Sequence, residues 1–240
     1  MREMRSAYTL TELLVATAVG SIVMAMAFSS FSIINTKYQK YSDLSNLHRS
    51  ATQVLNIITR DLRMAGYQDL DSVNGAWYQV AVSADNNSNS ERGSDAITII
   101  YDIDKQNRIK VKYYLACKEL NKCTEKEGRY RLYKTKWSKV NGSWKPDADY
   151  EGQAVADYID DLQFKYNMVN GNSENSIDPD EVKNLRSVDI SIMLRTARKH
   201  KKDKNYRHEL EDNGQFNLEG GYIRETFPTT AFTRNLELGG

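Results

Sequence analysis

The N-terminal apolar run constrains this chain more than any other feature. No charged residue occurs between Glu12 and Lys37, so the 24 residues Leu13–Thr36 are uncharged. As an α-helix they would extend about 36 Å at 1.5 Å per residue. That length exceeds the ~30 Å hydrocarbon core of a bilayer. The sequence therefore predicts a membrane-spanning helix close to the N-terminus, preceded by a short basic leader.

Glu12 lies just inside this apolar segment, where a carboxylate is costly and usually has a partner. No residue of the uncharged run can pair with it, so we expect a partner from outside the span. One candidate is a free α-amino group on Tyr8, four residues before Glu12, if the chain is cut after Ala7. The other candidate is the same amine of a neighbouring subunit.

The residues around this carboxylate also form a processing motif. An ordinary secretory signal has its small-residue cleavage site after the apolar region, whereas Ala7 precedes it. The segment resembles a type IV prepilin signal, whose pattern is Gly, an aromatic residue or Met, and then Thr-Leu-x-Glu. Thr9, Leu10 and Glu12 match, while Ala7 and Tyr8 stand where Gly and Phe are usual. The resemblance implies cleavage between Ala7 and Tyr8 by a prepilin peptidase, N-methylation of Tyr8 and a role for Glu12 in assembly. An uncleaved membrane anchor is the alternative.

Charge and hydropathy limit the partners. The 240 residues carry a formal net charge of +1, and loss of residues 1–7, with two Arg and one Glu, would leave a neutral chain. Neutrality argues against a general attraction for nucleic acid, although it leaves a local patch open. No specific nucleic acid is predicted. No later apolar run approaches 18 residues, which indicates a single span. Arg2 and Arg5 favour a cytoplasmic N-terminus.

The helix is expected to continue beyond the membrane. Apolar residues recur at steps of three or four, charged residues fall outside that stripe, and Gly66 follows as a helix-terminating glycine would. The predicted helix from Thr9 to Ala65 is about 85 Å long. We expect a leader at 1–7, a transmembrane half at 8–36, an amphipathic half at 37–66 and a β-rich head domain at 67–240. The stripe comprises Leu44, Leu47, Ala51, Leu55, Ile58, Leu62 and Ala65.

After the helix the apolar period changes from about 3.6 to two. Runs of strands after one long helix predict an α+β fold, a pilin-like helix packed on an antiparallel β-sheet domain. The Asn141-Gly142 pair predicts a hairpin turn. Polar loops are predicted at residues 83–94, 170–184 and 198–221. Residues 150–161 are left undecided between helix and strand. The expected strands are Trp77–Val82, Ala96–Tyr101, Ile109–Leu115, Tyr130–Lys136, Leu162–Met168, Val188–Leu194 and Ile223–Thr233.

Four later segments resemble PilW-type minor pilins and, more loosely, the J-type pseudopilins of type II secretion. They are Arg60–Tyr67, Asp161–Tyr166, Leu185–Thr196 and Thr230–Leu236. The resemblance implies a low-abundance subunit that helps prime or cap a type IV pilus. It implies other minor pilins, the major pilin and the prepilin peptidase as partners. It also implies a single-pass location in the bacterial inner membrane, with a periplasmic head, and then in the pilus on the cell surface.

Residues for catalysis or for a cofactor are scarce. His48, His200 and His208 lack a second ligand at metal spacing, and no phosphate-binding loop or nucleophile motif occurs. We therefore predict no enzyme, no cofactor and no metal. The neighbouring Asp160 and Asp161 would point to opposite faces of a strand, and a solvated pair is favoured over a catalytic one.

Two other groups of residues allow both a structural and a functional interpretation. Asp85, Glu91 and Asp95 could supply oxygen ligands to Ca²⁺, but a flexible polar loop is favoured. The tyrosines of the strands could form an adhesive surface, but packing on a half-buried sheet is favoured. The tyrosines in question are Tyr113, Tyr114, Tyr130 and Tyr133.

Cys117 and Cys123 are the only cysteines. Their five-residue separation between two predicted strands allows a disulfide-closed loop, and an exported position permits its oxidation. Two free buried thiols are the alternative. The spacing does not match the Cys-x-x-Cys of redox sites, so a bond here would be structural.

Two functions of different class follow from these features. The first is a filament or initiation-complex subunit whose helix packs with those of other pilins. The second is a periplasmic binding domain that uses the helix only as a membrane tether. The first is favoured because no flexible linker separates the span from the head. Type IV pilus and secretion pseudopilus remain alternatives within it.

Overall fold

The computed structural model describes residues 9–69, 81–89, 93–117, 130–140, 142–147, 152–200, 206–209, 215–218 and 220–236. The chain divides into two compact units, Met1–Ser45 and Asn46–Gly240. The second unit contains the last turns of the helix together with the sheets, and we call it the head. The division between the two units falls within the helix.

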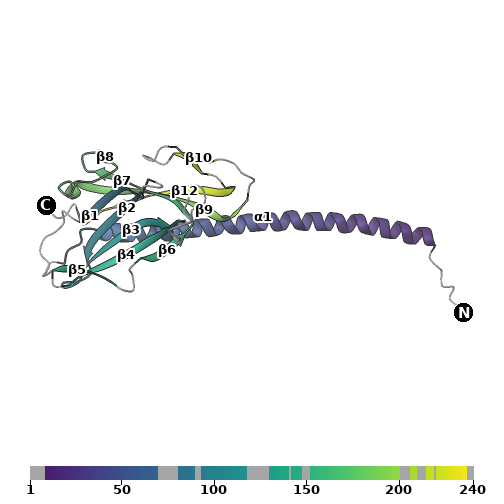
Figure 1. The fold of residues 1–240 in the computed structure, drawn as a ribbon, viewed down its shortest axis with the longest axis horizontal. Coiled ribbons are helices and arrows are strands. Elements are labelled where there is room, and N and C mark those ends of the chain that lie inside the picture. Colours follow the sequence, from purple (N-terminus) through teal and green to yellow (C-terminus); the bar gives the residue numbers. More distant parts are fainter. Residues whose placement is uncertain are drawn as a thin grey trace. The chain divides into compact units, whose positions relative to one another are not determined.

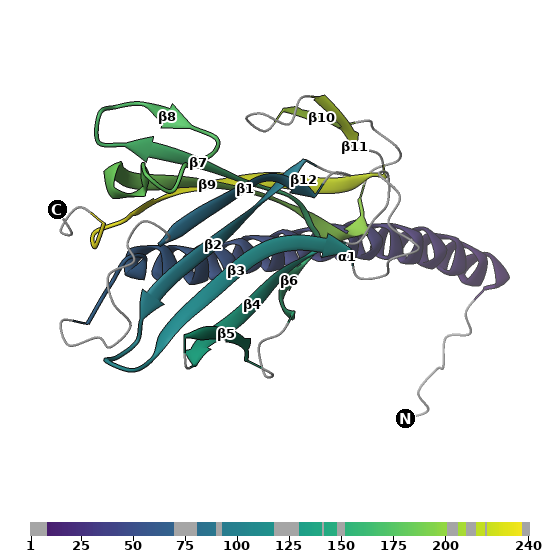
Figure 2. The ribbon, with the colours of Figure 1, turned by 60° about the vertical axis from the view of Figure 1, so that its left-hand side comes forward.

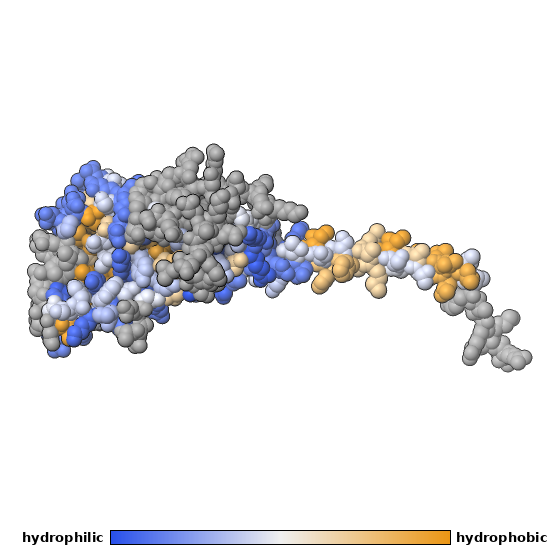
Figure 3. Space-filling view, viewed as in Figure 1, coloured by the Kyte–Doolittle hydropathy of each residue, from blue (hydrophilic) through white to orange (hydrophobic). Residues whose placement is uncertain are grey.

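One helix, α1 (Leu10–Met64), agrees with the predicted helix to within one residue at each end. In the first unit its side chains are exposed from Leu10 to Tyr41, and Figure 3 shows apolar residues along this stretch. By length and composition α1 could cross a membrane. The helix propagates without interruption because no Pro occurs in it and its one glycine, Gly20, is a modest cost in a helix of 55 residues.

Within the head, α1 buries most of the predicted stripe. Leu55 is only half-buried, with Val54 buried beside it, and Leu44, in the first unit, is also half-buried. The helix ends at Gly66, which has φ +76°, a conformation that suits glycine. A Cβ at Gly66 would also crowd the Leu236 side chain, so a larger residue there would force that side chain to move. The buried stripe residues are Leu47, Ala51, Val54, Ile58, Leu62 and Ala65.

The first sheet follows the chain order, and each neighbouring pair of its strands is antiparallel. Gly142, with φ +80°, forms the predicted tight turn between β4 and β5, where Val140 pairs with Ser143. The described strands are β1 (Val82–Asn89), β2 (Ser94–Asp102), β3 (Arg108–Cys117), β4 (Tyr130–Val140), β5 (Ser143–Pro146) and β6 (Gln153–Asp157), the last paired with β4.

The second sheet has the order β12-β9-β7-β8 and is also antiparallel. A separate hairpin pairs β10 (Tyr206–Glu209) with β11 (Gln215–Leu218). The sheet comprises β7 (Ile159–Met168), β8 (Ser173–Glu174), β9 (Leu185–Lys199) and β12 (Tyr222–Phe232), with a short 3₁₀ helix at Val182–Asn184. Figures 1 and 2 show the two sheets beside the last turns of α1.

Both sheets and α1 share one hydrophobic core. The sheets are also joined by polar contacts between β2 and β7. The Ser94 hydroxyl donates to Asp161 Oδ1 at 2.5 Å, and the Phe164 N–H donates to Asp95 Oδ2 at 2.9 Å. Asp95 and Asp161 are buried, so each carboxylate satisfies a donor that water cannot reach.

The structure corrects three sequence predictions. Residues 83–89 belong to β1, and the predicted loop at 198–221 contains β10 and β11. These segments are rich in polar residues and alternate only weakly between polar and apolar side chains, so their sequences did not indicate strands. Asp160 and Asp161 are buried, not solvated, because arginines of neighbouring strands and a serine of β2 pair with them.

Candidate functional site: the N-terminal helix and its anchor in the head

The first turn of α1 has a reciprocal capping arrangement. The Thr9 backbone N–H donates to Glu12 Oε2 at 2.8 Å, and the Glu12 N–H donates to Thr9 Oγ1 at 3.3 Å. The Thr9 hydroxyl also donates to the same carboxylate oxygen at 2.9 Å. This is a capping box, in which two backbone donors at a helix start are satisfied by side chains three residues apart.

Thr9 thus gives Glu12 hydrogen-bond donors in addition to the charged partner that the sequence predicts from outside the span. Within a single chain Thr9 already satisfies the carboxylate. The sequence pattern Thr-x-x-Glu before an apolar run is the signal that identifies the box. Ala7 and Tyr8 lie outside the described residues, so cleavage, methylation and pairing with the Tyr8 amine remain predictions.

The apolar stretch of α1 presents few polar groups to its surroundings. The hydroxyls of Thr17, Ser21 and Thr36 donate to carbonyl oxygens three or four residues earlier, at 3.0, 2.7 and 2.9 Å. Such bonds within the helix satisfy hydroxyls that hydrocarbon could not. The surface that remains suits lipid tails or the apolar faces of other helices, which indicates membrane anchoring.

Asp61, near the end of α1, anchors the helix in the head. Only 1% of its side chain is exposed, and its carboxylate accepts from Tyr113 Oη at 2.5 Å, Tyr101 Oη at 3.2 Å and Lys134 Nζ at 2.9 Å. These three donors come from β3, β2 and β4. One carboxylate thus ties α1 to three neighbouring strands of the first sheet.

The same arrangement perturbs the two tyrosines. Burial and the negative charge of Asp61 raise the pKa of Tyr113 and Tyr101 well above the ordinary value of 10.0. Both hydroxyls therefore stay protonated and donate to the carboxylate. Asp61 lies in the segment Arg60–Tyr67 that resembles minor pilins, but its role could not be predicted from sequence, because charged residues of a helix are usually solvated.

Cys117, the last residue of β3, is disulfide-bonded. Cys123 lies outside the described residues, so the Cys117–Cys123 pairing remains a prediction. A bond at this position would close the segment that follows β3.

The remaining candidates have structural partners. Arg224 Nε lies 2.6 Å from Asp160 Oδ2, and Arg195 Nε lies 3.5 Å from Asp160 Oδ1, all buried between β7, β9 and β12. Asp85 pairs with Lys112 at 3.2 Å, and Asp95 accepts from the backbone of β7. Glu91 lies outside the described residues. Over the residues with described positions, no group of three His, Cys, Asp or Glu side chains could hold a metal ion.

The structure gives other contacts for two of the three histidines. His48 Nε2 lies 2.6 Å from Glu225 Oε2, and the His48 ring meets Phe227 edge to face, with centroids 5.1 Å apart. His200 ends the paired region of β9, where its N–H donates to the Gly221 carbonyl at 2.9 Å. His208 is in β10.

Two comparisons with known proteins agree with this geometry. Residues 3–28 match the family model described as the prokaryotic N-terminal methylation motif. The type IV-like pilin TTHA1219 from Thermus thermophilus has a similar structure, with a TM-score of 0.51 and 10% sequence identity, over 79% of this chain and 96% of that one. The chain has a type IV pilin-like fold. No curated protein matches the sequence.

The predicted fold class is therefore confirmed, with a long N-terminal apolar helix packed on an antiparallel sheet domain. At 10% identity the structural likeness concerns the fold alone. The methylation motif covers the residues that carried the prepilin resemblance, including Ala7, Tyr8 and Glu12. Together these features show a type IV pilin-like fold with an N-terminal methylation motif.

Proposed function

We propose that this pilin-like protein is a minor pilin, a structural subunit that helps prime assembly of a type IV pilus and sits at or near its tip. Support comes from the exposed apolar part of α1 joined to a head with its own core. The head's core uses α1 from Leu47 onward. The turns from Leu10 to Tyr41 are exposed and are available to lipid and to other helices.

Glu12 carries the assembly step in this proposal. In the membrane the capping box and nearby water moderate the cost of the carboxylate. In a bundle of subunits Glu12 would lie among packed helices, where an unpaired charge is much more costly. The methylated amine of Tyr8, on the same or an adjacent subunit, would then replace Thr9 as the main partner and set the axial register.

Intact-mass measurement of membrane-extracted protein tests the processing. Cells that contain a prepilin peptidase should yield a chain that lacks seven residues and carries one additional methyl group. A retained Met1 in such cells would contradict the proposed cut between Ala7 and Tyr8 and favour an uncleaved anchor.

Crosslinking of Glu12→Leu to partner pilins tests assembly. At matched expression the variant should insert in the membrane, fold its head normally and associate less with other pilins. Glu12→Asp should do less harm because the charge remains. Thr17→Leu, another change of an exposed polar residue to leucine on α1, is the matched control. Undiminished association of Glu12→Leu would favour the tethered-domain function. Association only with secretion pseudopilins would assign the protein to a type II secretion pseudopilus.

A further inference from the structure

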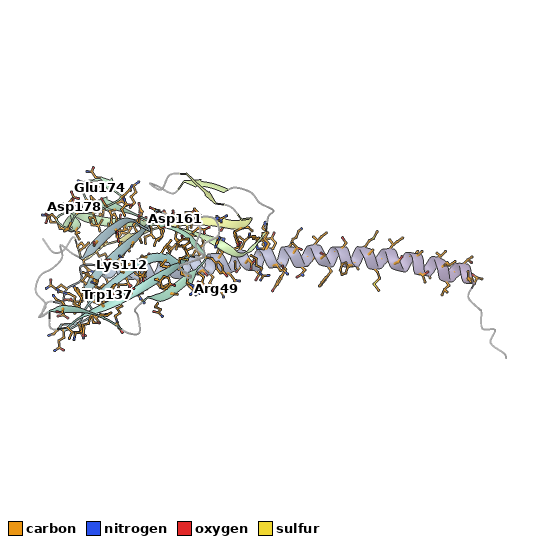
Figure 4. The ribbon with its side chains drawn as sticks, viewed as in Figure 1. Arg49, Lys112, Trp137, Asp161, Glu174 and Asp178 are labelled. Carbon is orange, nitrogen blue, oxygen red and sulfur yellow. The ribbon has the colours of Figure 1, made fainter. Side chains whose placement is uncertain are left out.

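The outer face of the first sheet carries aromatic and basic side chains that the pilin function does not use. Along β3 the buried residues alternate with partly exposed ones. The β4 residues opposite this partly exposed side are also partly exposed, except Thr135, which is buried. Figure 4 labels Lys112 and Trp137 on these strands. We call the following set the basic aromatic face: Lys110, Lys112, Tyr114, Arg131, Tyr133, Trp137, Lys139 and Trp144.

The aromatic rings of this face are ordered by their neighbours. Lys110 Nζ lies 4.6 Å from the ring centroid of Trp137 and 5.1 Å from that of Trp144, so one ammonium group contacts two indoles. Tyr114 and Tyr133, directly opposite on β3 and β4, stack with centroids 5.8 Å apart and planes 21° apart. Four flat, partly exposed rings thus lie on one side of three neighbouring strands.

The tyrosines of the strands divide between the two sides of the sheet. Tyr113 and Tyr130 are buried, as the packing interpretation predicted. Tyr114 and Tyr133 are partly exposed on the outer face. Packing in the core therefore accounts for only two of the four tyrosines. The outer two do not pack in the core.

Positive charge exceeds negative charge on the face. Lys112 pairs with Asp85, and Arg131 pairs with Asp157. Lys110 and Lys139 have no acidic partner among the described side chains. Burial and the neighbouring Lys112 lower the pKa of Lys110 below its ordinary value of 10.5. A bound anion would relieve this crowding of cations.

From this alternation we propose that the basic aromatic face binds single-stranded nucleic acid, with phosphates at the lysines and bases stacked on the exposed rings. Each nucleotide offers one anionic group and one flat ring, so both kinds of side chain have a counterpart. An acidic polysaccharide also offers charge, and its sugar rings can pack on aromatic side chains, so heparin is the competing ligand in the test below. The near-neutral chain as a whole has no general attraction for a polyanion, so binding would be confined to this face.

Fluorescence anisotropy of the detergent-extracted full chain with a fluorescein-labelled 15-nucleotide oligo(dT) tests the proposal. Tyr133→Leu and Trp137→Leu retain apolar bulk but lose the flat ring, and each should weaken binding about 5- to 100-fold. Lys139→Gln should reduce the slope of log affinity against log salt by about 0.7 without abolishing the dependence on the rings. Lys183→Glu, exposed on the 3₁₀ helix outside the face, is the control and should bind as the unaltered chain does.

Circular dichroism melting identifies any variant that fails to fold, and Lys139→Gln provides a test that leaves every ring in place. Loss of binding in the ring variants with intact folding supports the proposal. Three results would overturn it: no binding at 50 mM salt, equal weakening by Lys183→Glu, or heparin binding that the ring variants leave unchanged. The last result would assign the face to acidic polysaccharides instead.

Discussion

Removal of the Asp61 carboxylate should destabilise the head more than any single change of a surface charge. In Asp61→Ala, Lys134 would lose its carboxylate at a site where only 13% of its side chain is exposed. Loss of one partner of a buried ion pair typically costs about 3–5 kcal/mol. The Tyr113 and Tyr101 hydroxyls would also lose their acceptor. The free energy of unfolding of a typical domain is about 5–15 kcal/mol, so this one change would remove a large fraction of it.

Asp61→Asn removes the negative charge but keeps a side chain of nearly the same shape, so it measures the contribution of the charge alone. The amide can still accept from one or two of the hydroxyls, so we expect a smaller loss, about 1.5–3 kcal/mol, the usual worth of a hydrogen bond to a charged group. Asp85→Asn is the control, because Asp85 pairs with Lys112 on the surface with 53% of its side chain exposed. An exposed pair of this kind contributes about 0–1 kcal/mol.

Urea denaturation of the detergent-extracted full chain, followed by tryptophan fluorescence, measures these differences in the free energy of unfolding. The three tryptophans of the sequence all lie after α1, so the signal reports the head. The expected order of stability loss is Asp61→Ala, then Asp61→Asn, then Asp85→Asn. If Asp61→Ala cost no more than Asp85→Asn, the proposed anchor would be refuted.

Three further predictions concern other parts of the chain. The folded head raises the pKa of Tyr113 above 10.0. The Tyr113 hydroxyl therefore stabilises the head fully below pH 10, and this contribution declines at higher pH, where the unfolded chain loses the proton first. In alkaline urea titrations, Tyr113→Phe should reduce the decline of the free energy of unfolding with pH. Non-reducing peptide mapping should recover Cys117 joined to Cys123, and two free thiols would contradict the pairing. Thr9→Val should hasten amide hydrogen exchange at Glu12 because it removes the acceptor of that N–H, while the melting of the head stays unchanged; equal exchange would rule out the capping box.

The N-terminal half of this protein could be predicted from sequence because its determinants are local. Helix length, the absence of Pro, the helix-ending Gly66 and the period of the apolar stripe all lie within one continuous segment. They predicted α1 to within one residue at each end. The Asn141-Gly142 turn is likewise local, and it predicted the hairpin of β4 and β5.

Tertiary structure alone decided which polar residues are buried. Asp61, Asp95, Asp160 and Asp161 appear in sequence as ordinary charged residues, and only distant strands bring them their donors. The Ser94–Asp161 bond spans 67 positions and the Tyr113–Asp61 bond spans 52. A buried carboxylate is stable only where several such donors converge, and that convergence depends on strand order and register, which alternation within one strand does not specify. The open basic aromatic face depends on the same pairing, because register sets Lys110 beside Trp137 and Tyr114 beside Tyr133.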